Sequence, residues 1–376
     1  MEKPEVGAVH RIDSLDGLRG AAAVVVVAFH ALDYVKMSPS LLSSWLISPL
    51  GVVVNGPGAV HLFFVLSGYV LALTLAKDPG AGGVARFYAK RVFRLQPPYA
   101  AAVLVAWVAS IGYPIVGGYV LWLRTKSPCF HIPGRLLPTA LILPSVAYGQ
   151  LPVGWSLYVE LMMSAAFPAL LWLGRRLHPL APVVLGLAFI RPFHPLLYFA
   201  RFGLDFGVGL ALCLERQRVA RWMDRLPRAA MPWWLLGGVV LLQLPFAVTS
   251  WERGLASLEQ DHGPTTIALM SIGSGMLVAA AAHLPAVRYR LSRPMARFFG
   301  RISYSLYLVH MAVLALVICR VTGQRLPWYE GLAVFAVVLA ISIGAAEILW
   351  RTVEHPAIRA GRWVSDYGSR FGASSA

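Results

Sequence analysis

Apolar segments long enough to cross a lipid bilayer recur from one end of this 376-residue sequence to the other. The first occupies residues 17–35 and the second residues 59–76. A bilayer core about 30 Å thick is crossed by about 20 apolar residues in a helix. Only 13% of the residues are charged, against about 25% in ordinary soluble proteins. The pattern predicts an all-α, polytopic helical membrane protein, because helices satisfy their own backbone groups in lipid.

We expect about ten spans and one short re-entrant or interfacial segment at residues 136–148. The expected spans are residues 17–35, 59–76, 97–118, 154–173, 179–190, 195–214, 231–248, 264–283, 303–320 and 328–350. Pro97 and Pro98 would open the third span after a basic loop at residues 77–96. We expect a single membrane domain over residues 1–376, with no separate soluble domain and no cleavable signal peptide.

The formal net charge of +16 fits a membrane topology better than nucleic-acid binding. With the N-terminus in the cytoplasm and the spans alternating, all but nine of the 33 Lys and Arg residues fall on the cytoplasmic side. Cytoplasmic loops of membrane proteins carry this excess, so both termini are predicted to be cytoplasmic. Cys129, Cys213 and Cys319 show no CxxC spacing and are interpreted as packing residues.

Arg19 stands at the polar mouth of the first apolar helix, and His30 follows eleven residues later. The helical rise places His30 about 16 Å deeper, near the middle of the bilayer. An imidazole at that depth is energetically unfavourable unless it has a hydrogen-bonding partner, and such residues are usually functional. One interpretation is a packing histidine bonded to a neighbouring span, and the other is a functional histidine.

Arg91 and Arg94 are three residues apart and share a face if the segment is helical. Arg86 and Lys90 lie close behind them. Guanidinium groups bind phosphate in a bidentate manner, so the cluster suits a phosphate-bearing ligand. From spacing alone, a positive-inside cluster that touches lipid headgroups is the favoured alternative.

Several other ionisable residues fall inside apolar runs. Glu160, with Trp155, opens the fourth span, and it either orients a histidine, caps the helix or pairs with Arg201. Arg201 and Asp205 are spaced i, i+4 and are expected to form an ion pair, unless Arg201 lines a substrate cavity. His310 is a second histidine well inside an apolar run.

A few polar or small residues in or near the spans are weaker candidates, and the common nucleotide, metal and hydrolase motifs are absent from the sequence. Ser67 and Gly68 are expected to form a close-packing pair, His61 is a weak candidate, and Glu354 is expected to pair with a loop arginine. No P-loop, GxGxxG, HExxH or strand-bound GxSxG motif occurs, and the histidines lack zinc spacing. We therefore expect neither ATP nor a metal to take part.

Seven motifs together resemble the membrane acyltransferase 3 family, in the family's order and over nearly the whole chain. Arg19 and His30 reproduce its arginine–ten residues–histidine spacing, and Arg91 and Arg94 its arginine–two residues–arginine motif. The motifs are LDGLRG (residues 15–20) leading to His30, FFVLSGYV (63–70), RVFRLQPPY (91–99), GWSLYVE (154–160), RFGLDFGVG (201–209), ISYSLYLVH (302–310) and VEHP (353–356).

The resemblance implies a bacterial inner-membrane O-acyltransferase. Such enzymes usually transfer acetyl from cytoplasmic acetyl-CoA to a hydroxyl, often on a surface polysaccharide, lipopolysaccharide or lipid-linked glycan. Some members instead acylate small molecules such as macrolides. By the same resemblance, His30 is the expected catalytic histidine, and Arg91 and Arg94 bind the acyl donor or hold the active site.

The sequence departs from the family pattern in two places. Met162 and Met163 replace the usual aromatic pair after WSLYVE. The hydrolase-like C-terminal domain of some members does not occur in these 376 residues, so we expect the membrane domain to complete the transfer.

These observations combine into one mechanistic hypothesis. Acetyl-CoA docks from the cytoplasm with its phosphates on Arg91, Arg94 and Arg19. His30 acts as general base on the acceptor hydroxyl or takes the acyl group covalently. The supporting residues are Glu160 and Asp33, which would fix the imidazole tautomer, and Trp155, Arg201 and His310, which would contact the substrate.

A proton-coupled transporter is the rival from a different class, because buried His, Arg and Glu residues also suit proton transport. It would move its substrate without consuming acetyl-CoA. The seven ordered motifs favour the enzyme.

Overall fold

The computed structural model describes residues 12–32, 35–36, 48–78, 80–111, 151, 153–191, 195–253, 263–318 and 326–372. These residues are helical apart from their connections and a two-residue parallel pair, β1 (Val35–Lys36) and β2 (Leu326–Pro327). Six segments are long and apolar enough to cross a membrane: Asp13–Ala31, Gly56–Ala76, Gly154–Arg176, Arg228–Val248, Pro264–His283 and Tyr329–Ser365. The all-α membrane class is confirmed, whereas the expected span count stays a prediction. The segment at residues 136–148 lies outside the described residues.

The helices follow the order of the chain. They are α1 (Asp13–Leu32), η1 (Pro49–Val54), α3 (Gly56–Ala76), α4 (Ala81–Ile111), α7 (Gly154–Arg176), α8 (Ala181–Ala188), η4 (Pro195–Phe202), α9 (Gly203–Leu214), α10 (Arg216–Arg225), η5 (Arg228–Ala230), α11 (Met231–Arg253), α12 (Pro264–His283), α13 (Pro285–Leu291), α14 (Pro294–Ile318), α15 (Trp328–Leu349), the π-helical turn η7 (Trp350–Glu354) and α16 (His355–Gly372).

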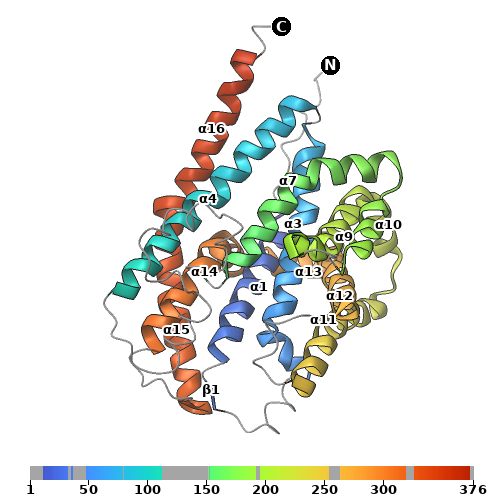
Figure 1. The fold of residues 1–376 in the computed structure, drawn as a ribbon. Helices are drawn as coiled ribbons and strands as arrows, with labels where there is room; N and C mark the ends of the chain where they lie inside the picture. The colour runs from blue at the N-terminus through green and yellow to red at the C-terminus, as the bar shows by residue number, and fades with distance from the viewer. Residues whose placement is uncertain are drawn as a thin grey trace.

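Helix α1 lies in the centre of the bundle and packs against α14 and α3 (Figure 1). Its Ala23 and Val26 are fully buried. Gly20 permits a very close approach to α14, because a Cβ at this position would lie 2.5 Å from the backbone nitrogen of Gly300. This contact brings the neighbouring Arg19 to the start of α14.

Helix α15 shows how the bundle meets the bilayer. Leu332, Val337, Ile341 and Ile348 are exposed apolar side chains, whereas Ala346 is fully buried. A row of exposed apolar residues on a membrane-spanning helix contacts lipid tails. The opposite faces of such helices build the protein core.

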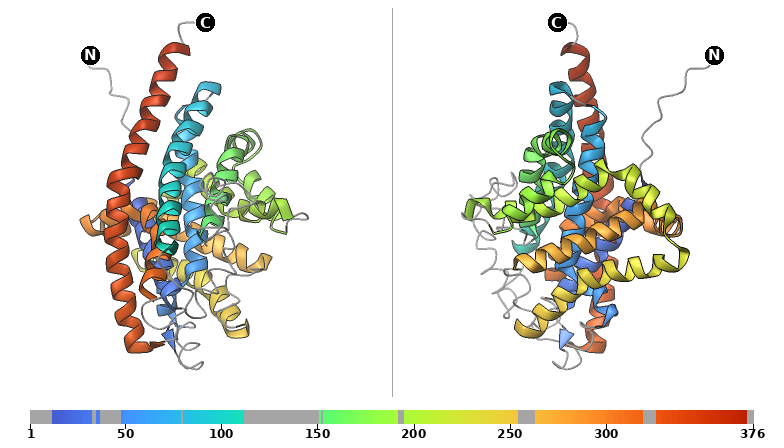
Figure 2. Two further views of the ribbon diagram at one scale, coloured as in Figure 1. Left: turned by 60° about the vertical axis from the view of Figure 1, so that its left-hand side comes forward. Right: turned by 90° about the vertical axis from the view of Figure 1, so that its right-hand side faces the viewer.

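Helix α4 corrects the predicted basic loop at residues 77–96. The helix begins at Ala81 and continues through Pro97 and Pro98, so these prolines lie inside it. Its first half packs along α16, where Gly361 lies against Phe93, and the two helices project together from the same end of the molecule (Figure 2). Tertiary packing therefore stabilises a helix in a segment whose charges suggested a loop.

The predicted small-residue pair in α3 is confirmed at one of its two positions. A Cβ on Gly68 would lie 2.9 Å from the Cα of Phe206, so α3 and α9 pack closely at this glycine. Ser67 instead points toward α7, where its hydroxyl lies 3.4 Å from Glu160.

Candidate active site

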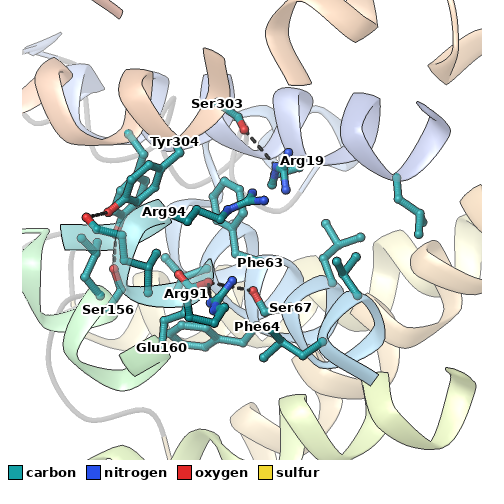
Figure 3. A pocket seen from close by; sticks show the side chains of 18 of the residues that line it. Arg19, Phe63, Phe64, Ser67, Arg91, Arg94, Ser156, Glu160, Ser303 and Tyr304 are labelled. Atoms are coloured by element: carbon teal, nitrogen blue, oxygen red, sulfur yellow. Dashed lines mark hydrogen bonds and ion pairs between the residues drawn. The ribbon is translucent and has the colours of Figure 1, made fainter. Parts of the chain in front are cut away.

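A cavity of about 90 Å³ lies between α1, α3, α4, α7 and α14 (Figure 3). Three basic residues from two helices, Arg19, Arg91 and Arg94, contribute to its wall. Its other polar or aromatic lining residues are Asp16, Phe63, Phe64, Ser67, Ser156, Glu160, Ser303, Tyr304 and Tyr307. The cavity thus collects side chains from five of the seven sequence motifs, including the one in the first turns of α1.

Arg19 is held at one wall of the cavity by α1 and α14. Its Nη2 donates to Asp16 Oδ1 at 2.7 Å and to the Gly300 carbonyl at 3.3 Å. Its Nε donates to the hydroxyl of Ser303 at 3.0 Å. These contacts fix the position of the guanidinium, while its charge stays close to the cavity (Figure 3).

Arg91 forms an ion pair with Glu160 across the cavity, from α4 to α7. Its Nε also donates to Ser164 at 3.3 Å. Arg94 lines the same cavity, which confirms that Arg91 and Arg94 share a face of one helix. The ionic partner of Glu160 is therefore Arg91, and of the alternatives considered for Glu160 the pairing with Arg201 does not occur among the described residues.

Two tyrosines of α14 shape the cavity. Tyr304 donates its hydroxyl hydrogen to the Leu95 carbonyl at 2.8 Å. The Tyr307 hydroxyl lies 2.7 Å from that of Ser156, at the start of α7. The Tyr307 ring also lies 5.9 Å, between centroids, from the imidazole of His310. One aromatic ring therefore lies between the cavity and His310.

His30 and His310 form a direct pair across α1 and α14. His310 Nε2 lies 3.2 Å from His30 Nδ1, and His30 Nδ1 lies 3.0 Å from the Val26 carbonyl. His310 is 1% exposed, whereas His30 is partly exposed. His30 does not line the cavity, but it lies on the same face of α1 as Arg19, since eleven residues make just over three helical turns.

The surrounding carbonyls define the tautomers of this pair in its neutral form. The Leu306 carbonyl can only accept, so His310 Nδ1, 3.2 Å away, carries the hydrogen. His310 Nε2 is then an acceptor, and His30 Nδ1–H donates to it. The basic lone pair of His30 is therefore on Nε2. The predicted tautomer-fixing role of Glu160 is not supported by its contacts, and Asp33 lies outside the described residues.

Trp155 and Arg201 lie next to the cavity rather than in its wall. The Trp155 ring packs against Phe202 at 5.5 Å and against Phe64, a lining residue, at 6.4 Å. Arg201 is 8% exposed, and its guanidinium carbon lies 5.9 Å from the Phe202 ring centroid. Both residues can therefore influence the cavity through Phe202 and Phe64.

The predicted Arg201–Asp205 ion pair does not occur among the described residues. Asp205 is fully buried and lies 2.9 Å from the Nδ1 of His61, which is 2% exposed. It also accepts a hydrogen bond of 2.6 Å from Ser271. Three helices, α3, α9 and α12, thus meet at the carboxylate of Asp205. The i, i+4 spacing of Arg201 and Asp205 therefore predicted the wrong partner for Asp205.

Glu354 also has a different partner from the one expected. Its Oε2 accepts a hydrogen bond of 2.6 Å from Ser305 in α14, and the residue is 3% exposed. A buried contact to a neighbouring span replaces the expected ion pair with a loop arginine.

Sequence reasoning missed Ser303, Tyr304 and Tyr307, which accompany His310 on α14. A signal was present, because Ser303, Tyr307 and His310 follow the i, i+4, i+7 spacing of one helix face. The described residues contain no cluster of three or more His, Cys, Asp or Glu side chains that could hold a metal ion. The chemistry available here is anion binding by arginines and proton transfer by an oriented imidazole.

Comparisons with known proteins agree with this chemistry. The profile of the acyltransferase 3 family, described as an acyltransferase domain, matches residues 12–347. The "Acyltransferase MdmB" of Streptomyces mycarofaciens is 27% identical over 93% of this chain and 92% of its own length. The "Putative O-acetyltransferase SAR0937" of Staphylococcus aureus is 24% identical over 95% of this chain, which spans 59% of that protein.

A third relative, "Protein 2 in picA locus" of Rhizobium radiobacter, is 32% identical over 41% of this chain and 78% of its own length. No solved structure matches the chain. The family profile covers most of the sequence, including the arginines of the cavity and both histidines. The chain therefore belongs to the membrane acyltransferase 3 family.

Proposed function

We propose that this protein is a membrane O-acyltransferase that moves an acetyl or other short acyl group from acyl-CoA to a hydroxyl of a carbohydrate acceptor. The acceptor would be a surface polysaccharide, a lipopolysaccharide or a lipid-linked glycan. The observation that carries the proposal is the arginine-lined cavity whose innermost aromatic residue contacts the His30–His310 pair. Family membership supports acyl transfer over the alternative of proton-coupled transport.

The donor site of the proposal is the cavity itself. Arg19 and Arg94 are cavity-lining guanidinium groups that suit the phosphates of acyl-CoA, while the charges of Arg91 and Arg19 are balanced by Glu160 and Asp16. A narrow space suits the slender pantetheine arm. The arm would extend about 16 Å along α1, from Arg19 to His30. The Tyr307 side chain has to turn aside to let the thioester reach the histidines.

The chemical step follows from the tautomer of His30. Nε2 takes the proton of the acceptor hydroxyl as its oxygen attacks the thioester carbonyl. The C–S bond then breaks, and the leaving thiolate receives the proton from Nε2. Neutral His310 accepts from Nδ1–H throughout and is a positioning residue. In the covalent variant, Nε2 attacks the carbonyl first and expels the thiolate. The hydroxyl oxygen then takes the acyl group from Nε2, and the hydroxyl proton goes to the thiolate.

The acceptor side of the proposal involves Trp155 and Arg201. Their aromatic neighbours Phe64 and Phe202 connect them to the cavity. Aromatic rings stack on sugar faces and also suit a macrolide, so a small-molecule acceptor is the second candidate.

The proposal also includes a location. We propose about ten spans with both termini cytoplasmic, in a bacterial inner membrane, because the basic residues concentrate at one set of helix ends. Arg175 and Arg176 end α7, and Lys77 follows α3. An acyl-CoA donor would then enter from the cytoplasm.

The test is free-thiol release from acetyl-CoA by the purified protein in nanodiscs, with a panel of glycans and macrolides. We expect acceptor-dependent release by wild type and a loss of at least about 100-fold in His30→Ala. His178→Ala is the matched control, because His178 is exposed in the connection between α7 and α8. Equal release by His30→Ala would remove His30 from the mechanism. A folded wild type that neither binds nor cleaves acetyl-CoA would favour the transporter.

A further inference from the structure

A second cavity, of about 430 Å³, lies at the N-terminal ends of α1 and α14. It is lined by Asp13, Asp16, Pro294, Arg297, Phe298 and Arg301. Asp16 lines this cavity and the first one, and it binds Arg19 at 2.7 Å. The two cavities therefore meet at the Asp16–Arg19 pair.

The structure holds Arg301 firmly in the wall of this second cavity. Its Nη2 donates to both carboxylate oxygens of Glu347, at 3.0 and 2.9 Å, and its guanidinium lies 4.2 Å from the ring centroid of Trp350. Within the described part of the chain, these bonds use Nη2 alone. Nε and Nη1 remain as donors for a ligand, on a group that is already oriented.

Arg297 lies one turn before Arg301 and is bound more loosely. Its Nη1 is 3.5 Å from Asp13, and its side chain is 53% exposed. Arginines spaced i, i+4 lie on the same face of a helix. Both also stand near the amino ends of α1 and α14, where the helix dipoles favour negative charge. The cavity wall thus presents two cations to an anionic ligand.

The remaining lining residues narrow the chemistry of that ligand. Phe298 offers an aromatic face for a flat ring, and Asp13 is an acceptor for amino or hydroxyl hydrogens. A free phosphate or a lipid headgroup would gain little binding energy from Phe298 and Asp13. Two arginines, one aromatic ring and two carboxylates, of which Asp16 is paired with Arg19, together fit a phosphorylated purine nucleoside.

We infer that this second cavity binds the 3′-phosphorylated adenosine end of the acyl-CoA donor, an inference that rests on the proposed function. The first cavity, at about 90 Å³, is too small for a nucleotide, whereas the second falls in the usual range of small-molecule sites. The donor then extends from the second cavity past the Asp16–Arg19 pair into the first cavity, and its pyrophosphate lies near Arg19 and Arg94. Its adenosine stays on Arg297, Phe298 and Arg301.

The test compares two donors in phosphatidylcholine nanodiscs: acetyl-CoA and acetyl-pantetheine, which lacks the nucleotide. We expect Arg297→Ala to raise the KM for acetyl-CoA about tenfold, the loss of one charge-assisted contact. The effect on acetyl-pantetheine should be much smaller. Arg297→Glu should raise the KM further. Arg290→Ala is the matched control, since Arg290 is an exposed arginine of α13 outside the cavity.

Direct binding separates this inference from the proposed function. Adenosine 3′,5′-bisphosphate should bind wild type in a calorimetric titration, with affinity about tenfold weaker in Arg297→Ala. Such binding without any turnover of acetyl-CoA would keep the nucleotide site and reject the enzyme. Equal KM changes for both donors, or nucleotide affinity unaffected by Arg297→Ala, would overturn the inference. An Arg297 effect that appears only in phosphatidylglycerol nanodiscs would assign the cavity to a lipid headgroup and overturn it as well.

Discussion

Two clusters of ionisable residues lie inside the bundle, and their side chains differ in solvent exposure. Helix α3 contributes His61 to the first cluster and contacts Glu160 of the second through Ser67. His61 and Asp205 are 2% and 0% exposed and share their hydrogen bonds with Ser271. Arg91 and Glu160 are 12% and 21% exposed and line a cavity. The first cluster is closed on all sides by side chains of three helices, whereas the second borders open space.

The difference teaches which buried charges hold the fold and which are placed for a ligand. A closed cluster with satisfied partners ties helices together, and removing one partner leaves an uncompensated polar group in a dry interior. A cluster at a cavity retains donors that a ligand can use. We therefore expect the His61–Asp205 cluster to govern stability and the Arg91–Glu160 cluster to govern turnover.

The sharpest test of this division is Asp205→Ala. We expect it to lower the free energy of unfolding by about 3–5 kcal/mol, because His61 and Ser271 lose their common acceptor. Thermal unfolding in detergent measures the loss. Molecules that remain folded should keep near-normal kcat and KM for acetyl-CoA.

The control for this prediction is Asp224→Ala, which removes an exposed carboxylate on α10. It should leave thermal unfolding unchanged. A stable Asp205→Ala protein with little thiol release would show that the closed cluster serves the reaction, and the comparison would fail.

Arg91→Lys should produce the converse result. Lysine keeps the charge but loses the planar fork that reaches Glu160 and Ser164 together. We expect the KM for acetyl-CoA to rise by about ten- to a hundredfold with little change in the unfolding temperature. Arg86→Lys, on the same helix but outside the cavity lining, is the matched control. A large loss of stability without a kinetic change would reverse the assignment of the two clusters.

His310→Phe tests the histidine pair next to the cavity. Phenylalanine fills a similar space but removes one of the two acceptors near His30 Nδ1–H, the other being the Val26 carbonyl at 3.0 Å. We expect kcat to fall about tenfold while the KM for acetyl-CoA changes little, because the ring of the general base is held in place less firmly. His310→Gln retains an acceptor oxygen and should recover part of the rate. Equal kcat in both variants would leave His310 with a packing role only.

The sequence predicted those features that depend on short spacing. The apolar runs predicted helices, and the run that holds Arg19 and His30 is helix α1. Arg91 and Arg94 share a face of α4, as their spacing of three residues predicted. Local composition failed where tertiary packing decides, as in the first half of α4, which is helical because α16 packs against it.

The choice of partners could not be predicted in this way. Glu160 pairs with Arg91, Asp205 with His61, and His30 with His310, across separations of 69, 144 and 280 residues. A single sequence contains many oppositely charged residues and does not state which spans are neighbours. The i, i+4 spacing of Arg201 and Asp205 therefore offered a local partner that the fold does not use.

The smallest expected effect lies outside both clusters, at Asp78. Arg86 donates two hydrogen bonds of 2.6 Å to this carboxylate and lowers its pKa below the usual value. Since the folded pKa is lowered, the contribution to stability is present above the unfolded pKa of about 3.9 and is lost as the pH falls through the folded pKa.

Asp78→Asn should accordingly lower the unfolding temperature by less than about 2 °C at pH 7, because the carboxylate is 43% exposed and well screened. The difference from wild type should shrink as the pH falls below about 3.9 and vanish once the pH is below the lowered folded pKa, where both proteins carry a neutral side chain. Unfolding temperatures measured in steps from pH 7 to below the folded pKa test this. A difference that persists at the lowest pH would mean that the hydrogen-bond geometry stabilises the start of α4, not the charge of Asp78.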